Sequence, residues 1–206
     1  MTTTRIAGIL LAAGQSTRYR EAAGADGPAT KLVATYQGKA LVRHVAEAGI
    51  AAGLAPLVVV TGHAREAVGA ALAELPLTFA HNADFATGMA SSVKAGLAQV
   101  PPEAAGALVL LGDMPLVSPG LISKLVEAFA KHPQAVAVLP VHAGERGNPV
   151  LLSRAMFADI LQLNGDAGAR QVLRGREADV IEVPVDEQAA RLDVDTPAEL
   201  NELGQG

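Results

Sequence analysis

The sequence of 206 residues contains no cysteine. This absence excludes disulfide frameworks, thiolate zinc sites and cysteine nucleophiles, and it fits a reducing compartment. Aromatic residues are also scarce, at 3%, whereas half of the residues are hydrophobic. The core must therefore be built from Ala, Val, Leu and Ile, and a chain of this length buries enough of them without a covalent or metal staple.

Positive charge is neither abundant nor clustered. The formal net charge is −5 and the lysines and arginines are spread along the chain, which argues against a nucleic-acid-binding protein and confines phosphate recognition to local sites. Gly, Pro or a charged residue interrupts every apolar run before it could span a bilayer, and we see no signal-type segment. We therefore expect a cytoplasmic protein that binds neither nucleic acid nor membranes.

Short apolar runs that do not alternate with polar residues predict strands buried on both faces. These runs cover residues 6–11, 57–61, 107–111 and 135–139. A three-to-four spacing of apolar residues predicts helices over 41–52, 64–75, 91–100 and 119–131. The alternation predicts an α/β fold with a doubly wound, mostly parallel sheet and helices on both faces, formed by residues 1–206 as one domain.

The regular alternation of predicted strands and helices ends after residue 139. We expect two short extended pieces between 141 and 152, short helices near 153–163 and 168–174, strands near 180–185 and 191–194, and a last helix from 197 to about 203. Residues 21–30, rich in Ala and Gly, have the composition of a linker inside the first connection. Ligands of open parallel sheets bind beyond the carboxyl ends of the strands, so functional residues are expected there.

The first predicted strand is followed by small residues and then by two cations. Residues 11–18 read Leu-Ala-Ala-Gly-Gln-Ser-Thr-Arg, and Lys31 comes later. Backbone N–H groups of such a loop can approach an anion closely, while Arg18 and Lys31 add positive charge. Neither a Walker loop nor a G-x-G-x-x-G fingerprint is present. Taken alone, the segment is compatible with a phosphate-binding loop and with an ordinary tight turn.

Carboxylates stand at two further positions where a ligand is expected. Asp113 lies in Gly-Asp-Met-Pro at 112–115, directly after a buried strand, and Asp193 and Asp195 would face the same side of an extended segment. Mg²⁺ usually takes one or two carboxylates and completes its shell with water and phosphates. Asp113 and Asp195 therefore predict a metal site between two loops, with a turn or cap aspartate as the alternative for Asp113. Thr-Pro-x-Glu at 196–199 starts a helix whatever the function.

Three more segments carry polar groups at the same edge or near it. Residues 82–92 open a helix with N–H groups and hydroxyls, which suits an anion or a ribose, although plain N-capping explains the same residues. Thr61-Gly62 forms a similar turn. Arg170 at a helix start opposes the helix macrodipole, which indicates an anionic partner, although the segment 165–170 is equally compatible with a turn alone. The five histidines show no metal-ligand spacing and are interpreted as surface or turn residues.

In this order, the motifs resemble those of the molybdopterin nucleotidyltransferases, and most closely the molybdenum cofactor cytidylyltransferase branch. The resemblance covers nearly the whole chain. It rests on Leu-Ala-Ala-Gly-x-Ser-x-Arg at 11–18, Lys-Leu at 31–32, Val-Val-Val-Thr-Gly at 58–62, Asn82 with Gly-Met-x-Ser-Ser at 88–92, Gly-Asp-Met-Pro at 112–115, Arg-Gly-Asn-Pro-Val at 146–150, Gly-Asp-x-Gly-Ala-Arg at 165–170 and Asp-x-Asp-Thr-Pro at 193–197. Ala13, where guanylyl-transferring relatives tend to carry Gly, favours the cytidylyl branch.

This resemblance implies a Rossmann-like nucleotide-diphosphate-sugar transferase fold, and it implies transfer of CMP from CTP to the terminal phosphate of molybdopterin with release of pyrophosphate. Mg²⁺, or Mn²⁺ in its place, would be bound by Asp113 and Asp195, and Arg18, Lys31 and Asp113 would be catalytic. The implied nucleotide-binding residues are Leu11, Ala12, Ala13, Gly14, Ser16, Arg18, Lys31, Thr61, Gly62, Asn82, Ser91, Ser92 and Gly112. The implied acceptor-binding residues are Asn148, Asp166, Arg170 and Asp193. Molybdenum hydroxylase apoenzymes or their insertion factors are the implied protein partners.

One segment departs from the pattern. Relatives carry Met or Phe and then Gly after the signature arginine, and they reach the lysine within a few residues; this chain has Tyr19 and Arg20 there and a longer segment 21–30. The departure keeps two alternatives open: a transferase with another NTP or another phosphorylated acceptor, and a member that serves as a nicotinamide-dependent oxidoreductase or a nucleotide-sensing module. Both aspartate motifs speak against hydride transfer, which does not need them.

Overall fold

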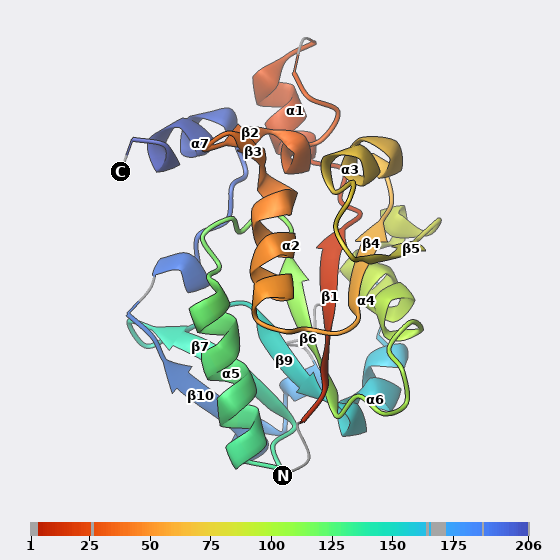
Figure 1. The fold of residues 1–206 in the computed structure, drawn as a ribbon, viewed down its shortest axis with the longest axis vertical. Helices are drawn as coiled ribbons and strands as arrows, with labels where there is room; N and C mark the ends of the chain where they lie inside the picture. Colours follow the sequence, from red (N-terminus) through yellow and green to blue (C-terminus); the bar gives the residue numbers. More distant parts are fainter. Residues whose placement is uncertain (1–3, 26, 164, 166–171, 187, 206) are drawn as a thin grey trace.

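The computed structural model describes residues 4–25, 27–163, 165, 172–186 and 188–205 (Figure 1). Its strands are β1 (Ile6–Ala12), β2 (Thr35–Tyr36), β3 (Lys39–Ala40), β4 (Leu57–Thr61), β5 (Thr78–His81), β6 (Gly106–Leu111), β7 (Ala137–His142), β8 (Glu145–Arg146), β9 (Val150–Ser153) and β10 (Val180–Pro184). Its α-helices are α1 (Thr17–Ala23), α2 (Leu41–Ala51), α3 (Arg65–Ala71), α4 (Met89–Leu97), α5 (Pro119–Lys131), α6 (Phe157–Leu161) and α7 (Pro197–Leu203). Short 3₁₀ turns include η1 (Lys31–Val33), η2 (Phe85–Thr87) and η5 (Glu177–Asp179).

The central sheet has the strand order β10-β7-β9-β6-β1-β4-β5, and β8 pairs with β7. β1 runs parallel to both of its neighbours, with Leu10 in register with Val59 of β4 and with Leu110 of β6. β9 alone of the strands on this path runs antiparallel to its neighbours, β6 and β7. The mostly parallel α/β sheet that the sequence predicts is therefore confirmed.

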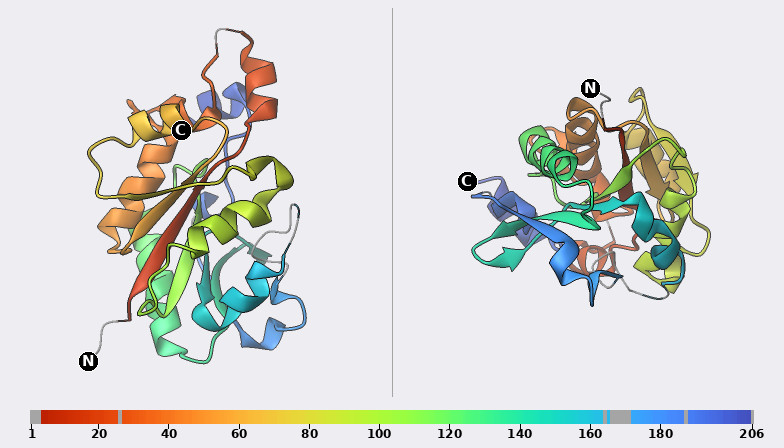
Figure 2. Two further views of the ribbon diagram at one scale, coloured as in Figure 1. Left: turned by 90° about the vertical axis from the view of Figure 1, so that its right-hand side faces the viewer. Right: turned by 90° about the horizontal axis from the view of Figure 1, so that it is seen from below.

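Helices cover both faces of the sheet (Figures 1 and 2). Successive residues of β1 enter different cores: Leu10 packs with residues of α2, α3 and α5, whereas Ile9 packs with residues of α4 and α6. This is why the strand sequence is continuously apolar instead of alternating. Within the part of the chain that the structure describes, no helix is long and apolar enough to cross a membrane.

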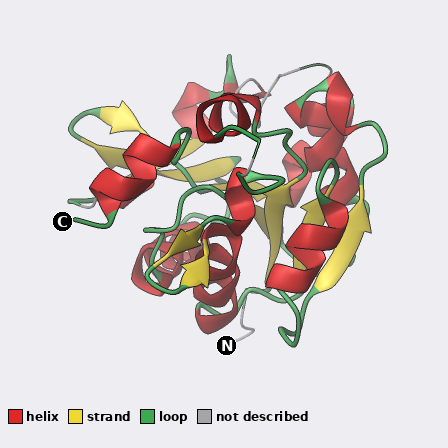
Figure 3. Ribbon diagram, turned by 90° about the horizontal axis from the view of Figure 1, so that it is seen from above, coloured by secondary structure: helices red, strands yellow, loops and turns green. Residues whose placement is uncertain are grey.

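A third, smaller apolar cluster lies beyond the carboxyl end of the central strands, where Figure 3 looks down on the molecule. It joins Tyr19 of α1, Tyr36 of β2 and Val194 of the C-terminal segment, and α7 contributes Leu200 and Leu203 to it. Packing against this cluster places the C-terminal segment above the sheet. The N-terminal and C-terminal parts of the chain thus meet at the sheet edge where ligands are expected.

Several elements differ from the sequence-based expectation. Residues 191–194 form no strand, because backbone pairing there consists of one hydrogen bond from the Val194 N–H to the Asp113 carbonyl, 3.0 Å long, and no ladder. β5 was not expected, because its side chains are mostly exposed at the edge of the sheet. Helix α1 reaches into the segment 21–30, whose Ala and Gly content has the composition of a linker.

Candidate functional site

A cavity of about 630 Å³ opens at the carboxyl ends of β1 and β6. The loop after β1, which we call the first loop (residues 13–16), forms one side of it, and η2 with the start of α4 forms another. Three aspartates from two distant segments, Asp113, Asp193 and Asp195, also line it. The cavity therefore combines small backbone-exposing residues with a concentration of negative charge.

The three aspartates form one cluster. Each offers a carboxylate oxygen, and these oxygens lie within 4.8 Å of one another. Lys31 of η1 enters the cluster: its Nζ is 2.8 Å from Asp113 Oδ2 and 2.7 Å from Asp195 Oδ1. Arg18 of α1 pairs with the other oxygen of Asp195, at 2.5 Å. Lys31 is 12% exposed and Arg18 is 76% exposed, so Lys31 is a fixed part of the cluster and Arg18 lies at its surface.

The crowding of charges shifts the pKa values of the cluster. Partial burial raises the pKa of Asp193, and the neighbouring charges of Asp113 and Asp195 raise it further. For Asp195, burial acts to raise the pKa, but the hydrogen bond and charge of Lys31, together with Arg18, leave it lowered. Burial alone would lower the pKa of Lys31, but its two aspartate partners outweigh burial and raise it. The surroundings thus favour the charged forms of Lys31 and Asp195 and disfavour the charged form of Asp193.

Asp113 Oδ1 is buried and has no hydrogen-bond partner among the described residues. A buried carboxylate oxygen without a partner is costly unless it receives a donor or a cation. A hard divalent ion prefers carboxylate oxygens, and the converging oxygens of Asp193 and Asp195 supply further ligands of this kind. The residues present therefore fit a Mg²⁺ or Mn²⁺ ion, with Asp193 added to the predicted pair Asp113 and Asp195.

The first loop is fixed by contacts to neighbouring strands. Ser16 adopts a left-handed conformation, with φ of 53°, and its hydroxyl lies 2.9 Å from that of buried Thr30. The Gly112 N–H donates to the Leu11 carbonyl, and the His63 N–H donates to the Ala13 carbonyl. Gly62 has room for no side chain, because a Cβ there would come within 2.7 Å of the Ala13 oxygen. Thr61, Gly62 and Gly112 therefore stand behind the loop and do not line the cavity.

On the opposite wall of the cavity, the side chain of Asn82 connects neighbouring residues through hydrogen bonds. Its amide nitrogen donates to the hydroxyls of Ser91 and Ser92, at 2.8 and 3.0 Å, and its oxygen accepts from the Asp84 N–H. The Ser91 hydroxyl in turn donates to the Gly88 carbonyl. Of these three predicted nucleotide-binding residues, only Ser92 lines the cavity, and the bonds of Asn82 and Ser91 point to a supporting role.

The structure brings many of the predicted site residues together and leaves others apart. Leu11, Ala13, Gly14, Ser16, Arg18, Lys31, Ser92, Asp113, Asp193 and Asp195 line the cavity, and Ala12 ends β1 beneath it. Asn148 does not line it; its N–H donates to the Ala190 carbonyl beyond β8. Asp166 and Arg170 lie outside the described residues. Sequence reasoning did not select Phe85 and Met89, whose apolar side chains also line the cavity, because apolar residues in a turn carry no chemical signature.

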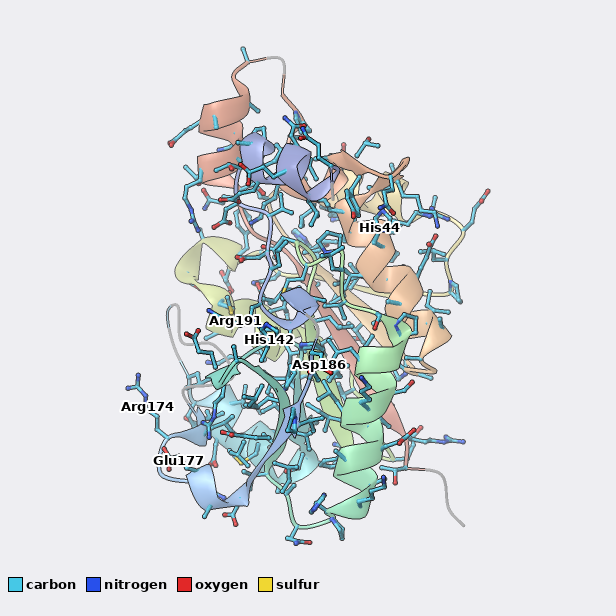
Figure 4. The ribbon with its side chains drawn as sticks, turned by 90° about the vertical axis from the view of Figure 1, so that its left-hand side faces the viewer. His44, His142, Arg174, Glu177, Asp186 and Arg191 are labelled. Atoms are coloured by element: carbon cyan, nitrogen blue, oxygen red, sulfur yellow. The ribbon has the colours of Figure 1, made fainter. Side chains whose placement is uncertain are left out.

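The histidines lie in separate places, as the labels of His44 and His142 in Figure 4 illustrate. His44 and His142 hydrogen-bond to the carbonyls of Tyr36 and Val185, and His132 to that of Ala128. None belongs to a cluster of potential metal ligands within the described ranges. His63, by contrast, contacts a side chain of the cavity region: its Nε2 lies 3.1 Å from Arg20 Nη1.

A helix-covered, mostly parallel sheet with a small-residue loop and acidic side chains beyond its carboxyl ends is the arrangement that the motif resemblance implies for a nucleotidyltransferase domain. Comparison of the sequence with known protein families agrees with this, because residues 8–181 match the family described as MobA-like NTP transferase domain. The chain belongs to that family, whose members bind an NTP and a phosphorylated acceptor and use divalent metals.

Several relatives give this likeness more detail. The nicotine blue oxidoreductase of Paenarthrobacter nicotinovorans is 29% identical over 96% of both chains. The molybdenum cofactor cytidylyltransferase of Escherichia coli (strain K12) is 31% identical over 59% of each chain. Among solved structures, Rv0371c from Mycobacterium tuberculosis H37Rv superposes with a TM-score of 0.84 at 29% identity over the whole of both chains, and its manganese complex superposes with a TM-score of 0.81.

Proposed function

We propose that this protein transfers CMP from CTP to the terminal phosphate of molybdopterin, with Mg²⁺ as the metal. The observation that carries the transfer chemistry is the cluster of Asp113, Asp193 and Asp195, with the unpartnered Asp113 Oδ1, in the same cavity as the first loop. Support for CTP and molybdopterin comes from the motif resemblance, including Ala13, and from the Escherichia coli relative named molybdenum cofactor cytidylyltransferase.

In this reaction a phosphate oxygen of the acceptor forms a bond to the α-phosphorus of CTP, while the bond from that phosphorus to the bridging oxygen breaks and pyrophosphate leaves. No protein nucleophile is needed; positioning and charge neutralisation supply the rate enhancement. A divalent ion held by the three aspartates would neutralise charge on the triphosphate. Backbone N–H groups of the first loop would hold the phosphates, with Ser92 and Met89 on the opposite wall of the cavity.

The two cations of the site have different tasks in this proposal. Lys31 is nearly buried between Asp113 and Asp195, so it fixes the orientation of both carboxylates. Arg18 is largely exposed, and an exposed ion pair contributes little free energy, so Arg18 can leave Asp195 for the triphosphate without a large cost. Asn148, Asp166 and Arg170 remain the proposed acceptor-binding residues, and Asp193 joins the proposed metal ligands. Molybdenum hydroxylase apoenzymes or their insertion factors remain the proposed protein partners.

An oxidoreductase is the second candidate, because the relative named nicotine blue oxidoreductase matches this chain over nearly its full length. A hydride-transfer site needs no cluster of three carboxylates, and Lys31 would fill such a site with a buried charge. Nucleotidyl transfer accounts for both features.

The test measures pyrophosphate release by the purified protein with Mg²⁺ and each NTP in turn, with and without molybdopterin. We expect release with CTP only in the presence of molybdopterin, and a decrease of about 100-fold or more for Asp113→Asn, because one buried metal ligand loses its charge. Asp179→Asn, an exposed residue at the amino end of β10, is the matched control and should retain wild-type activity. Release with another NTP would contradict the choice of base. Absence of release with every NTP, combined with NAD(P)H-dependent reduction of a dye substrate, would favour the oxidoreductase.

A further inference from the structure

Arg20 stands at a position where the motif resemblance expects glycine, and the structure gives it a specific partner. It lies in α1, the helix that follows the first loop, and its Nη1 is 3.1 Å from Nε2 of His63. His63 is 43 residues away in the sequence and follows β4. We call this contact the Arg20–His63 bridge. It links the end of the first loop to the neighbouring strand connection.

His63 also holds the beginning of the first loop. Its backbone N–H donates to the Ala13 carbonyl, at 3.3 Å. The same residue is thus bonded to both sides of residues 14–19, through its main chain before them and through its imidazole after them. The preceding residue, Gly62, packs so closely on Ala13 that an added Cβ would lie 2.7 Å from the Ala13 oxygen.

The bridge also reaches the cavity wall. The imidazole of His63 lies 6.0 Å from the ring of Phe85, measured between centroids, with the rings tilted by 58°. Phe85 lines the cavity next to the first loop. Arg20, His63 and Phe85 therefore connect α1, the turn after β4 and η2 in a row behind the cavity.

A simpler explanation for Arg20 is that a cation in the last turn of a helix complements the helix macrodipole. That role needs no partner and no fixed side-chain direction. The Arg20 side chain, however, is directed at one partner, His63. In this position its Nε is buried and has no hydrogen-bond partner among the described residues. A side chain used only for its charge would keep this donor in water instead.

We propose that Arg20 and His63 are positioning residues for nucleotide binding, and that their bridge holds the first loop in the conformation that presents its backbone N–H groups to the triphosphate. This inference rests on the proposed nucleotidyl transfer. In the motif pattern, a short glycine-containing turn links the signature arginine to the lysine. Here the connection up to Lys31 is longer, and the bridge prevents it from displacing the first loop. Neither residue touches the reacting atoms.

The experiment compares Arg20→Ala, His63→Ala and the double variant with wild type. Calorimetric titration with CTP and Mg²⁺ should show a dissociation constant about fivefold higher for each single variant, since one exposed hydrogen bond that holds the first loop is lost. The KM for CTP should rise by the same factor, with kcat within about twofold of wild type. The double variant should be no weaker than either single variant, because both remove the same bridge. Amide hydrogen exchange at residues 13–18 should be faster in all three.

Arg65→Ala is the matched control, because it removes one exposed arginine two positions from His63 and leaves the bridge intact. It should leave CTP affinity unchanged; an equal loss would assign the effect to long-range charge and overturn the inference. Additive losses in the double variant, or unchanged exchange at residues 13–18, would also overturn it. Should Arg20→Ala not fold, Arg20→Gln keeps a side chain of similar volume. If wild type binds none of the four NTPs, the proposed function fails as well; if wild type binds CTP and Arg20→Ala binds it equally well, only this inference fails.

Discussion

The repulsion among the three clustered carboxylates affects the pKa of Asp193. Partial burial raises its pKa, and Asp113 and Asp195 raise it further. An acid whose pKa is raised by folding destabilises the folded state increasingly as pH rises from its unfolded-state pKa of about 3.9 through its folded pKa. The penalty is complete above the folded pKa and absent well below the unfolded one.

We therefore expect Asp193→Asn to stabilise the protein by about 0.5 kcal/mol at pH 7 in the presence of a chelator, a value kept small because the side chain is partly solvated. The gain should shrink as the pH is lowered toward 4. Urea unfolding of the variant and wild type at both pH values measures it. The prediction is wrong if Asp193→Asn is destabilised at pH 7, or if the gain is as large at pH 4. Asp179→Asn should show no such gain.

At this scale, the sequence allowed two of the three clustered carboxylates, Asp113 and Asp195, to be predicted as neighbours. Asp113 was selected because it directly follows a buried strand, and Asp195 because its two-residue spacing from Asp193 would place both carboxylates on one side of an extended segment. Asp193 was assigned to the acceptor, yet the structure places it with the other two, as its two-residue spacing from Asp195 allows. The bridge between Arg20 and His63 was not predictable, because no local pattern joins residues 43 positions apart.

Among the helices and strands, too, some were predicted from the sequence and others were missed. Strands β1, β4, β6 and β7 follow from continuous apolar runs, and helix α5 follows from three-to-four spacing with the predicted bounds Pro119–Lys131. The edge strand β5 was missed because only Ala80 of its four residues is buried, so it lacks the apolar run that marks an interior strand. Residues 191–194 were predicted as a strand because they are extended and contain Val194, but this segment packs above the sheet and not in it.

The contact between the first loop and the turn after β4 provides a test of how closely these elements must approach. Gly62→Ala would place a methyl group 2.7 Å from the Ala13 oxygen and 2.7 Å from Phe85 Cβ. Because one neighbour is main chain, the loop itself must shift, and we expect a loss of about 1–3 kcal/mol in the free energy of unfolding together with weaker CTP binding.

Gly69→Ala is the matched control for this substitution. A Cβ at Gly69 meets no atom within 4 Å, and the residue lies inside α3. Alanine favours helix over glycine by about 0.8–1 kcal/mol, so this variant should be as stable as wild type or more so, with unchanged CTP binding. Chemical unfolding and calorimetric titration measure both variants. Equal stability of Gly62→Ala and wild type would refute the close approach.

Across the whole molecule, the carboxylate cluster connects parts that are distant in the chain. Asp113 extends from β6 in the middle of the sheet, whereas Asp195 immediately precedes the capping box of α7, where Thr196 and Glu199 fix the start of the helix. The Asp195 N–H donates to the Glu199 carboxylate, at 2.7 Å. A divalent ion bound to the cluster would therefore tie the C-terminal segment to the sheet.

This arrangement predicts that Mg²⁺ and Mn²⁺ stabilise the folded protein in the absence of any nucleotide. Binding at 100 times the dissociation constant adds about 2.7 kcal/mol, which corresponds to a rise in Tm of roughly 5 °C or more for a chain of this size. Thermal unfolding with either ion, against a chelator at matched ionic strength, measures the shift. Asp113→Asn should abolish most of it and Asp179→Asn none. An equal shift in Asp113→Asn would place the ion elsewhere.

The position of the cluster also has a consequence during synthesis on the ribosome. All the strands of the sheet and Lys31 precede Asp193 in the sequence, so they emerge from the ribosome first. The strands and the first loop are therefore synthesised while two of the three carboxylates are still missing. The proposed catalytic arrangement of charges is therefore completed late in synthesis, and a nascent chain that stalls before Asp193 contains Asp113 but neither of the other two carboxylates.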